Sequence, residues 1–413
     1  MMLKNYTLTN IGQLMGILPK ETLLLKGEEM GHINALHNAY VEVVDGKIQS
    51  FGLMDNCPET DEQVINLHGD WLMPGFVDSH THMVFASSRH NEYVMRLQGK
   101  TYEDIAAEGG GILNSAKKLQ AIDEDTLFKK ALKYAEEAIA SGTLALEIKS
   151  GYGLSVEGEL KMLRVIKKLK ETSSMMIKST FLGAHTFPAA FKEDHEGYIN
   201  SIINEMLPVI AAEKLADYID VFCETGFFSP EETDKICKAG AAYGLLPKLH
   251  VNQLNSIGGI EAGIKNNALS LDHLETVTEN EINLLAESKA VCTLLPSAAF
   301  FLRMEYQPAR KLIDAGAAIA LASDLNPGSS PSGNMNFVIS LSCIQMRMTP
   351  EESINAATMN GAYAMEVHSE AGSITKGKVA NLIITKSVPS LTYLPYAFGS
   401  NLIDKVMIRG TFI

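Results

Sequence analysis

Short apolar segments alternate along the chain with longer amphipathic ones. There are eight apolar segments, of which the first begins at Gly75, and most of them end in polar residues. They are GFVDSHTH (75–82), LALEIKS (144–150), MIKSTFLGAHT (176–186), YIDVFCET (218–225), LPKLHV (246–251), LSLDHLE (269–275), AVCTLLPS (290–297) and AAIALASD (317–324). This alternation predicts repeated βα units around a parallel sheet. Eight units favour an α/β fold of the (β/α)8 TIM-barrel type over a doubly wound open sheet, because no Gly-rich phosphate loop is present.

The segments between the strands carry helix start and stop signals. Ser229, Thr278 and Thr349 each stand three residues before a glutamate, which is the pattern of a capping box, and two of them are followed by proline. Glycines predict helix ends at Gly142, Gly240 and Gly316.

The two ends of the chain have a different pattern. Alternating apolar residues flank Asp45-Gly46, a strong signal for a type I′ hairpin, and short strand-like runs return near the C-terminus. Neither end can form a stable sheet alone. We therefore expect residues 1–70 and 372–413 to form one small β-sandwich domain beside a barrel of residues 71–371.

Composition narrows the class of protein. The chain has 413 residues, 46% of them hydrophobic, and a formal net charge of -14, so it has ample material for a core and no dense basic surface for nucleic acid. Its apolar runs are too short to cross a bilayer, and five scattered cysteines suit a reducing compartment. We expect a cytoplasmic protein with a small-molecule partner, and neither a nucleic acid nor a membrane.

Histidine and aspartate, which commonly bind metal ions, stand at the ends of several predicted strands. His80 and His82 end the first segment, and His250, His273 and Asp324 stand at or near the ends of the fifth, sixth and eighth. The C-terminal ends of barrel strands meet at one rim, so these side chains should lie together. Imidazoles with a carboxylate suit Zn²⁺ or Fe²⁺, which activates water for hydrolysis. The alternative is that the two histidines only satisfy polar positions at a strand end.

Longer motifs resemble a known family. GFVDSHTH, with histidines on the fifth and sixth strands and SD on the eighth, resembles the amidohydrolase superfamily. EIKSGYGL, STFLGAHTFP, LDHLE, LLPSAAFFL and ASDLNPGSSPSGNM resemble the imidazolonepropionase family within it, over about residues 72–346. The resemblance implies hydrolysis of the ring amide of 4-imidazolone-5-propanoate, an anionic substrate, to N-formimidoyl-L-glutamate in histidine degradation. It also implies a homodimer.

The resemblance assigns roles at the centre of the site. It implies one zinc or iron ion (Zn²⁺, Fe²⁺ or Fe³⁺) per subunit, held by His80, His82, His250 and Asp324. Paired-metal members of the superfamily use a lysine on the fourth strand, which this chain lacks. Asp324 would serve as general base, and His273 would polarise the scissile carbonyl or, alternatively, position Asp324. Asp78 would support a ligand or play a structural part.

The resemblance also assigns substrate-binding residues. They are Arg89, Tyr152, His185, Gln253, Asn326, Gly328 and Ser329. A guanidinium such as Arg89 can grip the propionate through two hydrogen bonds. Taken singly, Arg89, Tyr152 and His185 also fit a surface arginine, a core tyrosine and a strand-end cap.

One motif departs from the family. After its fifth-strand histidine the family usually carries an acidic residue, as HADE or HAEQ, whereas this chain reads His250-Val251-Asn252-Gln253. An amide can hydrogen-bond the ring but cannot move a proton, so we expect Asp324 and His273 to share the proton transfers.

Two other hypotheses for the function remain: a hydrolase or deaminase of another cyclic amide or amidine, and a scaffold without catalysis.

Overall fold

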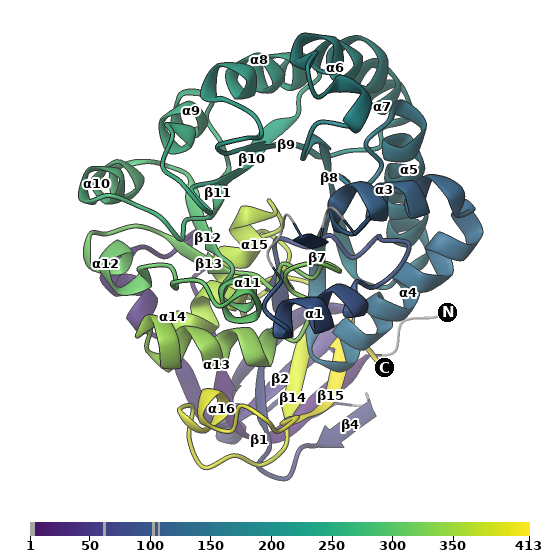
Figure 1. The fold of residues 1–413 in the computed structure, drawn as a ribbon. Helices are drawn as coiled ribbons and strands as arrows, with labels where there is room; N and C mark the ends of the chain where they lie inside the picture. Colours follow the sequence, from purple (N-terminus) through teal and green to yellow (C-terminus); the bar gives the residue numbers. More distant parts are fainter. Residues whose placement is uncertain (1–4, 61–62, 101–103, 106–107) are drawn as a thin grey trace.

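The computed structural model describes residues 5–60, 63–100, 104–105 and 108–413. A barrel of strands ringed by helices fills most of the molecule, and a separate sheet built from both chain ends lies against it (Figure 1). The expected (β/α)8 barrel with a terminal β domain is confirmed. The exact division at residues 70 and 372 stays a prediction.

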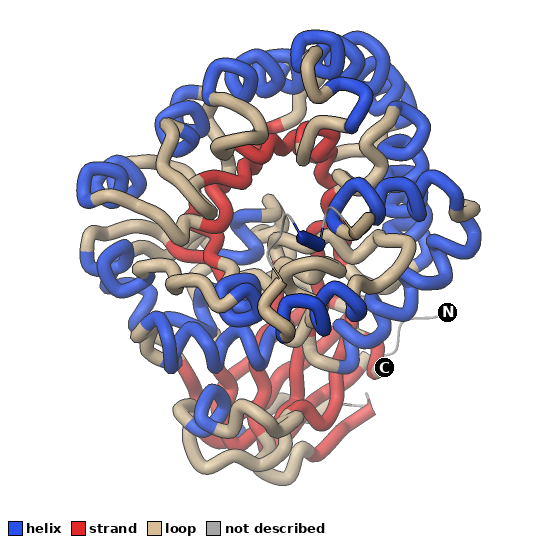
Figure 2. The backbone as a smooth tube through the Cα atoms, in the orientation of Figure 1, coloured by secondary structure: helices blue, strands red, loops and turns tan. Residues whose placement is uncertain are grey.

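The barrel wall consists of eight parallel strands in sequence order, one from each predicted segment (Figure 2). The strands are β6 (Phe76–Asp78), β7 (Thr143–Lys149), β8 (Met176–Ala184), β9 (Tyr218–Cys223), β10 (Leu246–Val251), β11 (Ser270–His273), β12 (Val291–Leu294) and β13 (Ile319–Leu321). Because every strand is parallel to its neighbour, all eight C-terminal ends lie at one rim.

The seam between β13 and β6 is closed just beyond the two strands. Thr81 and Leu325 form a parallel bridge, and the amide of His82 donates to the Leu325 carbonyl at 2.8 Å. Deeper in the seam, the Asp78 carboxylate accepts the backbone amide of Ser323 at 2.9 Å and also its hydroxyl. Asp78 therefore joins the first strand to the segment that carries Asp324, which is a structural role.

Helices surround the barrel, and the short helix α16 packs on α13 beside the terminal sheet (Figure 1). They are α1 (His90–Leu97), α3 (Gly111–Ala121), α4 (Glu124–Ala140), α5 (Val156–Thr172), α6 (His195–Ser201), α7 (Leu207–Glu213), α8 (Pro230–Ala241), α9 (Gly259–Lys265), α10 (Glu279–Glu287), α11 (Pro296–Leu302), α12 (Ala309–Asp314), α13 (Met335–Met346), α14 (Pro350–Asn355), α15 (Gly361–Ala364) and α16 (Tyr393–Tyr396). All three predicted capping boxes are present, at the starts of α8, α10 and α14.

The glycine signals are right at two helix ends and wrong at one. Gly142 and Gly316 follow α4 and α12 with φ of 89° and 96°. Gly240 instead lies within the last turn of α8, and a Cβ there would meet the Cδ1 of Ile219 at 2.7 Å. Its role is close packing of helix on strand, while Gly244, with φ of 80°, lies in the turn after the helix.

The terminal sheet joins strands from both ends of the chain. Its path is β16-β15-β14-β5-β1-β2-β3, with β4 paired to β1. The strands are β1 (Tyr6–Met15), β2 (Ala35–Val44), β3 (Lys47–Leu53), β4 (Gln63–Asn66), β5 (Trp71–Pro74), β14 (Leu382–Thr385), β15 (Ile403–Ile408) and β16 (Thr411–Phe412). Asp45 and Gly46 make the predicted tight turn between β2 and β3, with φ of 49° and 76°. Since β5 pairs with β1 and β14 immediately before β6 begins, this sheet fixes where the first barrel strand starts.

No helix in the part of the chain that the structure describes is both long enough and apolar enough to cross a bilayer.

Candidate metal centre and active site

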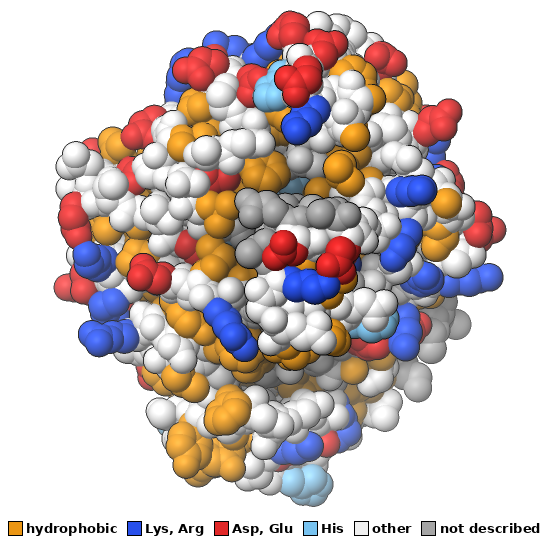
Figure 3. All heavy atoms as spheres, viewed as in Figure 1, with side chains coloured by type: hydrophobic (Ala, Val, Ile, Leu, Met, Phe, Trp, Pro, Cys, Tyr) orange, Lys and Arg blue, Asp and Glu red, His pale blue; other side chains and the backbone are white. Residues whose placement is uncertain are grey.

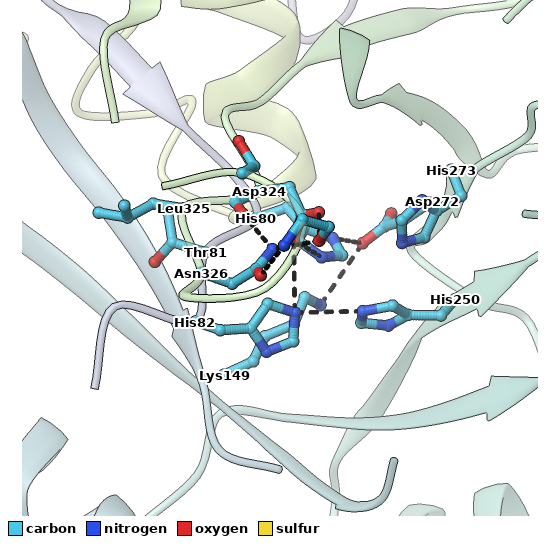
Figure 4. A network of polar contacts seen from close by, with 12 residues as sticks. His80, Thr81, His82, Lys149, His250, Asp272, His273, Asp324, Leu325 and Asn326 are labelled. Atoms are coloured by element: carbon cyan, nitrogen blue, oxygen red, sulfur yellow. Dashed lines mark hydrogen bonds and ion pairs between the residues drawn. The ribbon is translucent and has the colours of Figure 1, made fainter. Parts of the chain in front are cut away.

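Three buried histidines meet at the rim of the barrel. His80 and His82 lie on the extended segment after β6, and His250 stands on β10. One ring nitrogen from each lies within 4.8 Å of the other two, and all three residues are at most 3% exposed. Nε2 of His82 is 3.2 Å from Nε2 of His250 (Figure 4). The barrel thus brings together residues that are 168 positions apart.

The outer nitrogen of each imidazole faces a hydrogen-bond acceptor. Nδ1 of His80 donates to the Asp272 carboxylate at 2.6 Å, and Nδ1 of His250 donates to the Asp220 carboxylate at 2.8 Å. Nδ1 of His82 faces the Ser150 carbonyl at 3.5 Å. Since carboxylate and carbonyl oxygens only accept, the proton of each neutral ring lies on Nδ1, and each Nε2 presents a lone pair to the centre.

The three rings are neutral in this environment. Burial lowers the pKa of His80, His82 and His250 well below the ordinary value, and the neighbouring positive groups lower it further. Neutral imidazole is the form that binds a metal ion.

The donor set fits a metal ion. Nε2 of His80 is buried and has no hydrogen-bond partner among the described residues. The Nε2 atoms of His82 and His250 are both acceptors, so no hydrogen is available to join them across their 3.2 Å separation. Buried lone pairs that face one another are unfavourable unless a cation lies between them. Imidazole nitrogens with Nδ1 bonded to carboxylates are the usual ligands of zinc and similar ions.

Asp324 faces the same centre from the other side of the seam. Its Oδ1 lies 3.6 Å from Nε2 of His80 and 3.7 Å from Nε2 of His82. The residue is 2% exposed, and burial raises the pKa of its carboxyl to about 7. Its backbone has φ of 53°, a left-handed conformation that turns the side chain toward the histidines at the end of β13.

His273 ends β11 beside the cluster. Its ring centre is 5.1 Å from that of His250 and 5.8 Å from that of His80. Nδ1 faces Oε1 of Glu275 at 3.4 Å. Burial alone would lower the pKa of His273, but the charges of Glu275 and of nearby aspartates raise it above the ordinary value. His273 is thus suited to donate a hydrogen bond or a proton, unlike the three neutral histidines.

Tyr152 and His185 lie beside His82. The His185 ring stacks on the His82 ring at 5.3 Å, and the Tyr152 ring meets both edge-on. Nδ1 of His185 donates to the Gly151 carbonyl at 3.0 Å, and burial lowers the pKa of this histidine to about 4. These two residues form an aromatic wall next to the centre.

Arg89 is held in place by an ion pair that the sequence analysis did not anticipate. Its Nε and Nη2 both donate to Oε2 of Glu92, at 2.7 and 2.5 Å, and the other oxygen of Glu92 accepts the Gly111 amide. The arginine packs on the loop after β13, where a Cβ at position 328 would come within 2.5 Å of Nη1. Only glycine at 328 permits this approach.

Asn326 organises that loop. Its amide group donates to the Asp324 carbonyl and to the Ser329 hydroxyl, and its Oδ1 accepts the amides of Gly328 and Ser329. All four hydrogen bonds of the side chain therefore lie within the loop. In this structure Asn326 shapes the loop around Asp324, while Ser329 places its hydroxyl 3.4 Å from Oδ2 of Asp324.

The two amides after His250 have different surroundings. Asn252 is fully buried and donates to the Thr276 carbonyl and to Glu281, so it ties the loops after β10 and β11 together. Gln253 is partly buried in a loop whose next amides, those of Leu254 and Asn255, are held by Glu224. Of the two, Gln253 is the one whose side chain is available to a ligand.

Sequence reasoning missed the residues that support the histidines. They are Glu147, Lys149, Asp220 and Asp272, and Glu92 and Glu275 play similar parts for Arg89 and His273. The signal was present in the first four, because each is a charged residue inside a segment that was predicted to be a buried strand. Buried charges are rare unless they are paired.

Comparisons with known proteins agree with this geometry. The model of the amidohydrolase family matches residues 71–413. An imidazolonepropionase of Flavobacterium johnsoniae is 54% identical over 405 residues, which cover 98% of each chain.

Solved structures share the fold at low identity. The guanine deaminase of E. coli has a TM-score of 0.73 at 13% identity and covers 100% of this chain and 99% of its own. An adenosine deaminase of Xanthomonas campestris, solved with bound zinc, has a TM-score of 0.71 at 15% identity, covering 99% and 92%. The extent of the family match and the 54% identity show that this chain belongs to the amidohydrolase family and, within it, to the imidazolonepropionases.

Proposed function

We propose that this chain hydrolyses the ring amide of 4-imidazolone-5-propanoate to N-formimidoyl-L-glutamate, a step of histidine degradation. The observation that carries the proposal is the buried cluster of His80, His82 and His250, whose acceptor nitrogens converge at the barrel rim. The 54% identity to an imidazolonepropionase supports this substrate over other cyclic amides.

The centre is suited to one zinc or iron ion per subunit, held by His80, His82, His250 and Asp324. A bound ion of this kind supplies a Lewis acid that lowers the pKa of a water molecule to roughly 7. On β9 the chain has no lysine that could bridge a second ion. Asp220 of that strand instead holds His250 through two hydrogen bonds, at 2.8 and 3.1 Å.

Hydrolysis adds water across the ring C–N bond, so one proton must leave the water and one must reach the ring nitrogen. Asp324, whose carboxyl faces the cluster, accepts the proton from the attacking water. His273, held by Glu275 and carrying a raised pKa, polarises the carbonyl and donates its own proton to the leaving nitrogen, and the proton gained by Asp324 balances the one that His273 loses. The pKa values suit this division of labour, because a carboxyl with a pKa of about 7 can accept a proton near neutral pH and the raised pKa of His273 favours the form that donates one.

The substrate groups match the residues that surround the centre. Arg89 is held by Glu92 at Nε and Nη2, and no bond from Nη1 to a described residue is seen, so this edge is left for the propionate. Tyr152 and His185 pack against the imidazolone ring, and Gln253 hydrogen-bonds it. Gly328 and Ser329 line the same side as Arg89, and Asn326 keeps their loop in shape.

The protein is further proposed to be a cytoplasmic homodimer. All five cysteines are free in the structure, as in proteins of a reducing compartment. Large apolar side chains are exposed on α13 and around α16, at Ile344 (59%), Tyr396 (74%) and Phe398 (63%). Figure 3 shows apolar side chains gathered over the region of α16. Contiguous apolar surface of this kind typically mediates association, here between two copies.

Removing the metal ion should abolish hydrolysis. We expect the purified protein to contain about one zinc or iron ion per chain, to lose turnover on chelation, and to regain it when the ion is returned.

Asp324→Asn should lower kcat by about 10²–10⁴-fold, the usual contribution of a general base. Metal analysis and turnover of fresh imidazolone propionate test both. The exposed Asp314 provides a matched Asp→Asn control, and a metal-loaded parent without turnover would reject the proposed reaction.

Arg89→Leu should raise KM about tenfold or more with a smaller change in kcat. A hydrogen bond to a charged group contributes about 1.5–3 kcal/mol, and the contact with the propionate is the same in the ground and transition states. Steady-state kinetics measure the split. Lys100→Leu is the control: it removes a cation from the turn after α1 and should leave KM unchanged. If Arg89→Leu left KM unchanged too, the propionate would bind elsewhere.

Gln253→Glu tests the assignment of the proton transfers. Because Asp324 and His273 already supply a base and an acid, a carboxylate at position 253 should change kcat by no more than a few-fold at any pH. The experiment is a pH profile of kcat for the parent and the variant. A large gain in turnover would mean that an acid at this position performs a transfer that we assign to Asp324 or His273.

Light scattering coupled to size-exclusion chromatography tests the assembly. We expect the mass of two chains for the parent and of one chain for a variant with Tyr396→Asp and Phe398→Asp, since a charge buried in an interface is strongly unfavourable. The control is a variant with Leu23→Asp and Leu53→Asp, which places the same charges on exposed apolar residues outside α13 and α16. A monomeric parent would reject the homodimer.

A further inference from the structure

Five charged residues lie inside the barrel beneath the histidine cluster with at most 1% of their surface exposed. They are Glu147, Lys149, Asp220, Lys248 and Asp272. Charges in such a place are tolerated only when they are paired, because the loss of hydration costs several kcal/mol for each ion. Their pairing therefore shows which of them depend on one another.

Lys149 lies at the centre of this group. Its Nζ is 2.9 Å from Asp220, 2.9 Å from Glu147 and 3.4 Å from Asp272. Burial by itself would lower the pKa of this lysine, but the charges of Asp220, Glu147 and Asp272 together raise it. The side chain is therefore a fixed cation on β7, between β9 and β11.

Two of these contacts lead directly to the metal centre. The Oδ2 atom of Asp272 that lies near Lys149 is the atom that accepts Nδ1 of His80. The Oδ2 atom of Asp220 that binds Lys149 likewise accepts Nδ1 of His250. One ammonium group thus links the oxygens that orient two of the three imidazoles, and Figure 4 shows this chain of contacts on the His80 side.

We propose that Lys149 is a positioning residue of the metal centre, which sets the tautomer and orientation of His80 and His250 together by holding the two carboxylates that bind their Nδ1 atoms. This inference rests on the proposed metal centre and goes beyond its four ligands. The physical reason is electrostatic. Without the ammonium, the two anionic carboxylates would lie in a dry interior with no cation between them, and their repulsion would turn at least one of them away. A carboxylate that turns away no longer holds its imidazole in the metal-binding orientation.

Lys248 provides a matched control within the same barrel. It is equally buried, and its Nζ binds the other oxygen of Glu147 at 3.0 Å, the Ser270 hydroxyl and the Ala364 carbonyl. Its bonded contact with Asp272 runs through Ser270, which donates to Oδ1 and not to the oxygen that holds His80, and its charge acts on Asp272 less than that of the nearer Lys149. Both lysines should support the fold, but only Lys149 should support the metal centre.

The experiment compares Lys149→Met with Lys248→Met, since methionine keeps the length of the side chain and removes its charge. Each protein is stripped of metal, and its affinity for Zn²⁺ is measured by competition with a chelating dye, without substrate. We expect Lys149→Met to bind zinc about 10–100-fold more weakly than the parent, as is typical when the support of a ligand is lost. The zinc affinity of Lys248→Met should stay close to that of the parent. Urea unfolding of the metal-free proteins should show reduced stability in both variants. The Co²⁺-loaded proteins give a second readout, because only Lys149→Met should shift the visible absorption bands.

The inference is overturned if Lys149→Met binds zinc as tightly as the parent, or if the two variants weaken binding equally. Should Lys149→Met fail to fold, Lys149→Gln serves in its place, since its amide can still donate to one carboxylate, and the same comparison with Lys248→Gln applies. The result is separate from the test of the reaction, because zinc affinity is measured without turnover. A parent that binds zinc but does not hydrolyse imidazolone propionate would reject the substrate and leave the role of Lys149 intact. A parent that does not bind zinc would reject both.

Discussion

The pairing of buried charges inside the barrel is the constraint on which the metal centre depends. Three carboxylates and two ammonium groups are enclosed by strands β7, β9, β10 and β11, and each must keep a partner because water is excluded. Two of these carboxylates, Asp272 and Asp220, accept the Nδ1 hydrogens of His80 and His250. The histidines therefore have little freedom to rotate or to change tautomer, and their lone pairs converge on one point before any ion binds.

The residues proposed to hold the ion and those proposed to face the substrate stand on different parts of the fold. The histidines lie at strand ends, where the hydrogen bonds of the barrel fix their backbone. Arg89, Gln253 and the Asn326–Ser329 loop lie on connections between strands and helices. Loops can change without disturbing the barrel, so one architecture serves several substrates. The guanine deaminase of E. coli, with a TM-score of 0.73 at 13% identity, shows how far sequence can diverge while this fold is retained.

Several residues at the rim adopt a left-handed backbone although they are not glycine. Among them are Asn252, His273 and Asp324, with φ of 53°, 86° and 53°. Such conformations are unfavourable for residues with a Cβ and persist only where the surrounding contacts hold them. Asn252 is held by Thr276 and Glu281, and Asp324 by the seam and by Asn326. At His273 and Asp324 the consequence is a side chain directed at the histidine cluster where the strand ends.

The sequence by itself determined the elements of this protein and the chemistry at the strand ends. Eight apolar segments, three capping boxes and the Asp45-Gly46 turn depend on neighbours a few residues apart, so their pattern is legible in the chain. Only the tertiary structure decided the role of Gly240, the pairing of Arg89 with Glu92, the use of Asn326 within its own loop and the contacts of Lys149. Asp78 meets Ser323 across 245 residues, and Lys149 meets Asp220 across 71. Such contacts follow from strand register and barrel closure, which no local pattern specifies.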